Sequence, residues 1–153
     1  MHSSLTIADY LLERGKKNEN TDKPITLTPM QLIKLVYLCH GWMIGLYKQP
    51  LLVDSVEAWR YGPVIAGLYH AVKKFGSGPV RGPLSKDKVE FNKQEKSVMN
   101  QVFDIYGKFT GIELSSLTHA PGTPWSKMWY AGREIIPNDL IQEHFAGLAK
   151  QEE

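Results

Sequence analysis

The longest run of closely spaced apolar positions lies in LTPMQLIKLVYLCHGWMIGLYK, residues 27–48. Apolar residues recur there at intervals of three and four and occupy most faces, which is typical of a nearly buried helix at the centre of a fold. Its start is well marked, because Thr28 can act as the N-cap, Pro29 suits the first helical position and Gln31 completes a capping box. We therefore predict a central helix that begins after Thr28 and continues to residue 46.

Four residues interrupt the apolar pattern of this helix. Gly41 and Gly45 each cost about 1 kcal/mol relative to alanine in a helix, so we expect another backbone to cross close to them. Lys34 and His40 are polar, and the apolar span that they interrupt is too short to cross a bilayer. The segment is therefore predicted to be a core helix and not a membrane anchor.

Shorter helical patterns occupy much of the remaining chain. Thr6 and Asn138 are candidate N-caps, and Gly15 and Gly111 are candidate helix ends. The GSGPVRGP segment, residues 76–83, is predicted to be a loop. We expect helices over residues 6–17, 64–75, 93–109, 113–118, 125–131 and 138–149.

One short segment alternates between apolar and polar positions instead of following a helical period. In SVEAWR, residues 55–60, successive side chains should point to opposite faces, as they do in a strand. Tyr61, Gly62 and Pro63 are predicted to break this strand, and Gly62 and Pro63 to turn the chain into the next helix. Residues 135–136, both isoleucine, are a second strand candidate.

The composition agrees with a soluble globular protein. Of the 153 residues, 42% are hydrophobic and 22% are charged, and the net charge is +2. We predict a mainly α fold: a single compact helical domain over residues 1–153, ordered from about 6 to 149, with a small antiparallel β element. A lone cysteine, Cys39, fits a reducing compartment, and Asp9 and Glu13 interrupt the apolar stretch that a signal peptide would need. A cytoplasmic protein is therefore expected.

The candidate residues for enzymatic chemistry are poorly arranged. Cys39 and His40 are adjacent, so on a helix their side chains point about 100° apart and do not face each other. Cys39 also lies on the apolar stripe, where a small buried core residue is the favoured interpretation. The five histidines show no metal-ligand spacing, and no phosphate-binding glycine motif is present. We therefore predict no enzyme activity, no metal and no cofactor.

A basic stretch between residues 73 and 96 raises the possibility of nucleic-acid binding. Its cations could contact phosphates, but no helix-turn-helix or base-stacking aromatic motif accompanies them. Lysines that keep the protein soluble are the favoured interpretation. The cations concerned are Lys73, Lys74, Arg81, Lys86 and Lys88.

The segment EAWRYGPV, residues 57–64, concentrates residue types that are common at binding hot spots. Trp59 is expected to pack on the central helix, and Gly62 to shape the turn. Arg60 can pair with Glu57 or stack on an aromatic ring. For Arg60 and Tyr61 a structural role and a partner-binding role remain equally open.

A second irregular segment, LTHAPGTPW, contains His119 and Trp125. The His119 ring can bond to a backbone group and fix the turn, or it can face a partner. Both segments interrupt ordered elements with Gly and Pro, as binding loops on a rigid scaffold often do. We therefore take Arg60, Tyr61, His119 and Trp125 as the candidate partner-binding residues.

Three motifs follow one another along the chain: KLVY with a following GW at residues 34–42, EAWRYGPV at residues 57–64, and LTH followed by PW at residues 117–125. In this order and spacing they resemble the Panacea domain, also described as the SocA-like or GepA-like phage-associated family. The resemblance runs from Thr6 to about residue 145. The residues that we take to define its fold are Trp42, Glu57, Trp59, Gly62 and Pro63.

The resemblance implies a bacterial or prophage antitoxin, a non-enzymatic domain that binds and neutralises a cognate toxin protein. Some members of the family are thought to deliver the toxin to an ATP-dependent protease, so a proteolytic adaptor role is implied as well. Members pair with very different toxins. The residues themselves leave two alternatives, a nucleic-acid-associated prophage regulator and, less favoured, a Cys-His hydrolase that uses Cys39.

Overall fold

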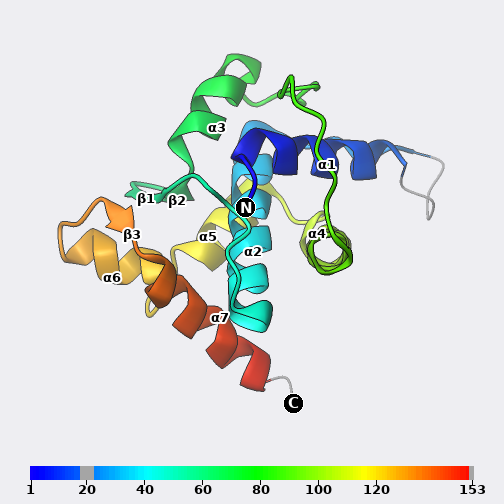
Figure 1. Cartoon of the computed structure of the whole chain (residues 1–153). Coiled ribbons are helices and arrows are strands. Elements are labelled where there is room, and N and C mark those ends of the chain that lie inside the picture. The colour runs from blue at the N-terminus through cyan, green and yellow to red at the C-terminus, as the bar shows by residue number, and fades with distance from the viewer. Residues whose placement is uncertain (18–22, 152–153) are drawn as a thin grey trace.

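A computed structural model describes residues 1–17 and 23–151 of the chain. The fold is mainly α with a small antiparallel sheet, as predicted, and its helices surround one long central helix (Figure 1). The elements are α1 (Ser4–Lys16), α2 (Pro29–Tyr47), β1 (Val56–Trp59), β2 (Gly62–Val64), α3 (Ala66–Val72), the 3-10 helix η1 (Lys73–Phe75), α4 (Lys93–Tyr106), α5 (Gly111–Thr118), α6 (Pro124–Tyr130), β3 (Ile135–Ile136) and α7 (Asn138–Gln151).

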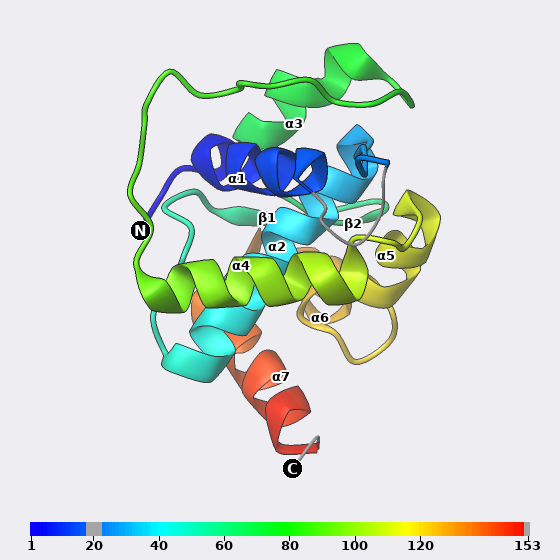
Figure 2. The same cartoon turned by 90° about the vertical axis from the view of Figure 1, so that its right-hand side faces the viewer.

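Helix α2 is the centre of the core, which confirms the prediction from its apolar pattern. It packs against α1, α4, α5 and α7, and Figure 2 shows α1 and α4 side by side across one of its faces. Its start has the predicted capping box: Gln31 N–H donates to Thr28 Oγ1, and Thr28 N–H donates to Gln31 Oε1. The buried apolar side chains form one cluster around this helix.

The two glycines of α2 lie where α7 crosses it, as predicted. A Cβ atom on Gly41 would overlap the ring of Phe145, and a Cβ atom on Gly45 would lie 2.6 Å from Phe145 Cβ and 3.0 Å from the backbone nitrogen of Ala146. Contacts that short cannot form without a shift of one helix. The close approach explains why helix-weakening glycines occur in the middle of α2.

The sheet has the strand order β2-β1-β3, and both pairings are antiparallel. Strand β1 confirms the alternation in SVEAWR, and β3 confirms the prediction for residues 135–136. The strand ends at a turn made by Arg60 and Tyr61, so the expected break is confirmed at Tyr61, but the expectation that Gly62 and Pro63 turn the chain into the next helix is wrong. Gly62 and Pro63 belong to β2, where Trp59 pairs with Gly62 and Ala58 with Pro63.

Several predicted helix ends are wrong at the level of single residues. Ser3, and not Thr6, caps α1, because its side chain accepts from the Thr6 backbone N–H. Gly15 lies inside α1 and not at its end, and a Cβ atom there would overlap the carbonyl oxygen of Ile25. Gly111 begins α5 and does not close α4.

The helices predicted over residues 64–75 and 93–109 are also shorter than expected. Residues 64–75 divide into the end of β2, the helix α3 and the 3-10 turn η1, and α4 ends at Tyr106 instead of continuing to residue 109. Asn138 is the first residue of α7, and its side chain bonds to His40 from α2. Tertiary contacts, which local patterns do not contain, set these ends.

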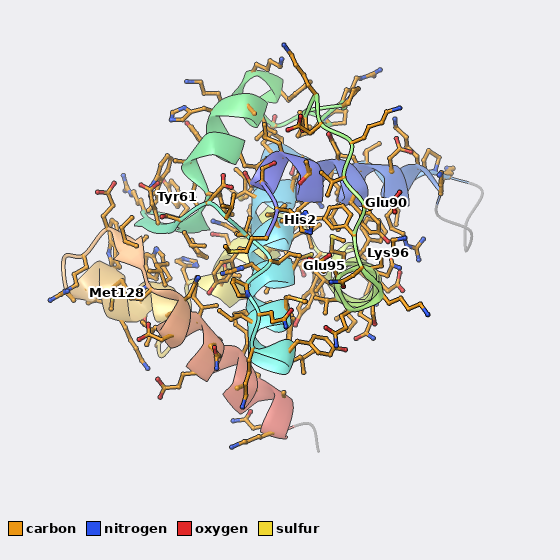
Figure 3. The ribbon with its side chains drawn as sticks, in the orientation of Figure 1. His2, Tyr61, Glu90, Glu95, Lys96 and Met128 are labelled. Carbon is orange, nitrogen blue, oxygen red and sulfur yellow. The ribbon has the colours of Figure 1, made fainter. Side chains whose placement is uncertain are left out.

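The first residues of the chain are held against α4 and against the segment after α2. His2 N–H donates to Leu51 O over 2.8 Å, and Val53 N–H donates to His2 O over 2.9 Å. His2 Nε2 lies 2.8 Å from Glu95 Oε2 of α4, and both residues are labelled in Figure 3. In the described part of the chain, no helix is long and apolar enough to cross a membrane.

Candidate functional site

The tip of the β1–β2 hairpin presents two of the four predicted partner-binding residues to solvent. Arg60 and Tyr61 are both exposed, and 60% of the Tyr61 surface is accessible. The Arg60 guanidinium carbon lies 5.5 Å from the centroid of the Tyr61 ring, a cation–π distance. Figures 1 and 3 show the hairpin between α3 and α6, with Tyr61 labelled on the side away from α1 and α4. The tip therefore offers a cation and an aromatic ring together.

The backbone of this tip is held from α5 and α6. Trp125 Nε1–H donates to Trp59 O over 2.5 Å, and Ser115 Oγ–H donates to Tyr61 O over 2.6 Å. These two bonds flank Arg60 and satisfy carbonyls on both sides of the turn. They also bring the EAWRYGPV corner next to the His119–Trp125 segment. The exposed side chains are thus carried on a fixed backbone.

His119 fixes the turn after α5, one of the two roles that its position allowed. Its ring Nδ1 bonds to Ser115 O, the same carbonyl that accepts from its own backbone N–H. The ring also packs edge-on against the Trp125 ring, with centroids 5.2 Å apart. His119 is half-buried, so part of the residue remains accessible to solvent.

Trp125 is 4% exposed, and its indole ring stacks on Trp129 with an interplanar angle of 14°. Its position therefore suits support of the hairpin more than direct contact with a partner. The exposed aromatic surface on α6 comes instead from Trp129 and Tyr130, which are 41% and 83% exposed. Neither residue was singled out from the sequence, because single aromatic residues on a short helix are ordinary core candidates.

The other residues of the corner hold the hairpin. Trp59 is half-buried, its Nε1–H donates to Glu57 Oε1 over 3.3 Å, and its ring meets Tyr69 of α3 with centroids 5.0 Å apart. Glu57 therefore accepts from Trp59, and Arg60 lies over Tyr61. Of the two partners that the sequence allowed for Arg60, the structure selects the aromatic ring.

Gly62 follows the tip and is required by its conformation. Its φ is +120°, a region that residues with a side chain rarely adopt, and a Cβ atom there would lie 3.0 Å from Lys34 Nζ.

Trp42 lies towards the other end of α2. It donates from Nε1 to Tyr106 OH over 3.2 Å and packs edge-on against Phe145. Trp42 thus belongs to the core contacts of α2, far along that helix from the hairpin.

Lys34 is the polar residue beneath the hairpin that sequence reasoning did not assign to a role. It is 2% exposed, and its Nζ donates to Pro63 O over 2.9 Å. Because burial disfavours the charged ammonium, the pKa of Lys34 falls from 10.5 to about 7. The available signal was its place in an otherwise apolar helix, where a lysine must find a buried acceptor.

His40, the second polar residue of α2, has a structural role. Its Nδ1 accepts from the backbone N–H groups of Leu51 and Leu52, both over 3.2 Å, so its Nε2–H donates to Asn138 Oδ1 over 2.9 Å. Burial lowers the pKa of His40, and the Asn138 bond opposes that shift. His40 is fully buried and joins the end of α2 to the following segment and to α7.

Cys39 is fully buried, and burial raises the pKa of its thiol. The neutral thiol is a poor nucleophile, and the neighbouring His40 uses both ring nitrogens in other hydrogen bonds. In residues 1–17 and 23–151, no three His, Cys, Asp or Glu side chains are placed to hold a metal ion. The described residues therefore present Arg60 and Tyr61 at the hairpin tip, and they do not pair the Cys39 thiol with the His40 ring.

Comparison with known proteins gives the family. The family described as "Antitoxin SocA-like, Panacea domain" matches residues 32–126, which contain most of α2, the hairpin and the start of α6. Antitoxin SocA of Caulobacter vibrioides (strain NA1000 / CB15N) is 25% identical over 131 residues, which cover 78% of this chain and 66% of that protein, so the match spans slightly less than two thirds of the relative. No solved structure matches the chain. The protein belongs to the antitoxin SocA-like family of Panacea domains.

Proposed function

We propose that the protein is an antitoxin that neutralises a cognate toxin by direct protein–protein contact. The observation that carries this proposal is the family match over residues 32–126, together with the similarity to a protein named antitoxin SocA. An antitoxin must be in the same compartment as its toxin, and we propose that this compartment is the cytoplasm.

The contact surface that we propose is centred on Arg60 and Tyr61. Arg and Tyr are over-represented among residues that dominate binding energies, and both are exposed at the hairpin tip. The bonds from Trp125 and Ser115 hold the backbone of the tip before any partner arrives. A preformed surface loses less conformational entropy on binding, which favours affinity. His119 supports this surface from the side.

A binding mechanism without enzymatic chemistry is supported by the surroundings of Cys39. The thiol is fully buried and has a raised pKa, so neither access nor ionisation favours attack on a substrate. Neutralisation then depends on this protein remaining bound to the toxin. Delivery of the bound toxin to an ATP-dependent protease is a further step that the same contact would allow.

Co-expression with the adjacent gene tests the function. We expect a small neighbouring gene to stop growth when it is expressed alone, and growth to return when this protein is expressed with it. The two proteins should then copurify. Growth arrest that this protein does not relieve, or rescue without a complex, would contradict the proposal.

The half-life of the toxin in cells separates the two modes of neutralisation. If the protein neutralises the toxin by binding alone, the toxin should be long-lived within the complex. If the protein is an adaptor, it should shorten the half-life of the toxin in a strain with active ATP-dependent proteases and not in a strain without them. Binding to DNA or RNA that weakens steeply with added salt, in the absence of a toxin complex, would favour the nucleic-acid regulator instead.

A further inference from the structure

A groove runs beside the hairpin tip, between the first turns of α2, the hairpin and α3. Its volume is about 470 Å³, within the range of ligand pockets, roughly 300–1,000 Å³. Most of the side chains along it are apolar or aromatic. Its main walls are Ile33, Trp59, Tyr61, Val64, Tyr69 and Val72.

The charged residues that line the groove are all basic. Lys34 lines it from α2, Arg60 from the hairpin and Lys73 from the start of η1, and none of its described lining residues is acidic. Arg60 and Lys73 are exposed, whereas Lys34 is 2% exposed. The groove therefore combines an apolar surface with positive charge both at its rim and within its wall.

Lys34 is the buried one of these three cations. Its ammonium has three N–H donors, and the hydrogen bond that it makes goes to a neutral carbonyl, Pro63 O. The other titratable residues that line the groove with it are Arg60, Tyr61, Tyr69 and Lys73, and none of them is a carboxylate. Burial without a carboxylate explains the low pKa of Lys34, about 7.

We propose that this groove binds an acidic segment of the toxin, which places an apolar side chain against the aromatic walls and a carboxylate beside Lys34. The inference rests on the proposed function in taking the partner to be a toxin. A carboxylate would supply the opposite charge that Lys34 lacks in the free protein, and Arg60 can accept a second carboxylate at the rim in a two-bond contact.

The same features argue against a nucleic-acid occupant. A phosphate backbone is bound by several exposed cations along its path, and only Arg60 and Lys73 are exposed here. Trp59 and Tyr69 meet edge-on, with an interplanar angle of 62°, and so do not form a flat pair of rings for stacked bases. An acidic side chain next to an apolar one fits both the walls and the charge.

Nuclear magnetic resonance titration of the full chain with short peptides tests the chemistry of the groove without any toxin. The probe is Gly-Asp-Phe-Glu-Gly with blocked ends, and the matched peptide is Gly-Asn-Phe-Gln-Gly. We expect the acidic peptide to shift the amide signals of residues 59–64 and 69–76 and to bind at least five-fold more tightly than the neutral one. Shifts elsewhere, or equal binding of the two peptides, would overturn the proposal.

Two variants and one control assign the effect to the groove. Lys34→Met keeps the length and packing of the side chain, and Arg60→Glu reverses an exposed charge at the rim and carries little risk to folding. Both should remove the preference for the acidic peptide, and Lys150→Met, an exposed lysine at the end of α7, should keep it. Unchanged preference in both groove variants, or stronger shifts of the same amides by single-stranded oligothymidine, would refute the inference.

Co-expression separates this inference from the proposed function. If Lys34→Met and Arg60→Glu still neutralise the toxin as well as the wild type, the groove assignment is wrong and the antitoxin function stands. If the wild type binds the acidic peptide in the groove but relieves no toxicity, the preference of the groove for an acidic segment stands, whereas the proposed function and the toxin as the source of that segment are wrong.

Discussion

Replacement of Lys34 by methionine should change how the stability of the protein depends on pH. The pKa of Lys34 is about 7 in the folded protein, against 10.5 in an unfolded chain. Between these two values the unfolded chain holds more protons than the folded one, so the wild type becomes more stable as the pH rises. Methionine has no proton to release, and Lys34→Met should lack this rise.

The size of the effect follows from the two pKa values. Linkage predicts that the cost of burying Lys34 falls from about 4 kcal/mol at pH 7 to about 2 kcal/mol at pH 9. Above pH 9 the raised pKa values of Cys39 and Tyr37 act in the opposite direction, because the unfolded chain then loses protons that the folded protein keeps. The window from pH 7 to 9 is therefore the informative one.

Urea unfolding of the wild type and of Lys34→Met at pH 7 and pH 9 measures this difference. We expect the variant to be the more stable protein at pH 7, with an advantage that shrinks by about 2 kcal/mol at pH 9. The contributions of Cys39 and Tyr37 are common to both proteins and cancel. The same stability difference at both pH values would show that Lys34 is not buried against Pro63 as described.

Three further substitutions test other parts of the account. His40→Ala should cost about 2–4 kcal/mol in urea unfolding, because it leaves two buried backbone N–H groups without their acceptor; a loss under 1 kcal/mol would contradict the hydrogen bonds described. Gly45→Ala should lower the stability by about 1–2 kcal/mol, because overlap with Phe145 exceeds the gain in helix propensity. Gly147→Ala, which has open space around it, should raise the stability by up to about 1 kcal/mol. Shifts of the melting temperature in the same direction for both variants would refute the close helix crossing. Cys39→Ala should leave toxin neutralisation intact in the growth assay, and its loss in a folded variant that still binds toxin would favour the hydrolase.

Local sequence signals were sufficient for the central helix and for the main strand. The start of α2 depends on Thr28, Pro29 and Gln31, which lie next to one another, so their hydrogen bonds can be predicted without the rest of the chain. Gly41 and Gly45 predicted a close helix crossing because glycine destabilises a helix, whereas its lack of a side chain lets another backbone approach. The partner in that crossing, α7, could not be named from the spacing.

The features that could not be predicted depend on contacts between distant segments. Strand β2 was missed because Gly62 and Pro63 are typical of turns, and their strand conformation comes from pairing with β1. Asn138 was expected to cap its own helix but bonds to His40, 98 positions away in the chain. In both cases the residue types fit the local prediction, but contact with a distant segment determined the observed conformation or hydrogen bond.

The candidate site shows the same division. Arg60 and Tyr61 were identified from residue type and position, because exposed turns rich in Arg and Tyr are common binding surfaces. The bond from Ser115 to Tyr61 and the burial of Lys34 beneath the hairpin came only from the structure. Lys34 carried a usable signal, since a lysine within an apolar helix must be buried with an acceptor or reach the surface.

The most direct test of the proposed contact is the affinity of the purified protein for its toxin, measured by isothermal titration calorimetry for the wild type, Arg60→Ala and Lys150→Ala. Truncation of a hot-spot residue costs at least ~2 kcal/mol, or roughly a 30-fold loss of affinity. We expect Arg60→Ala to show that loss with an unchanged melting temperature, because its side chain is exposed and lies over Tyr61, and Lys150→Ala to bind as the wild type does. Wild-type affinity in Arg60→Ala would contradict the hairpin tip as the toxin-binding surface.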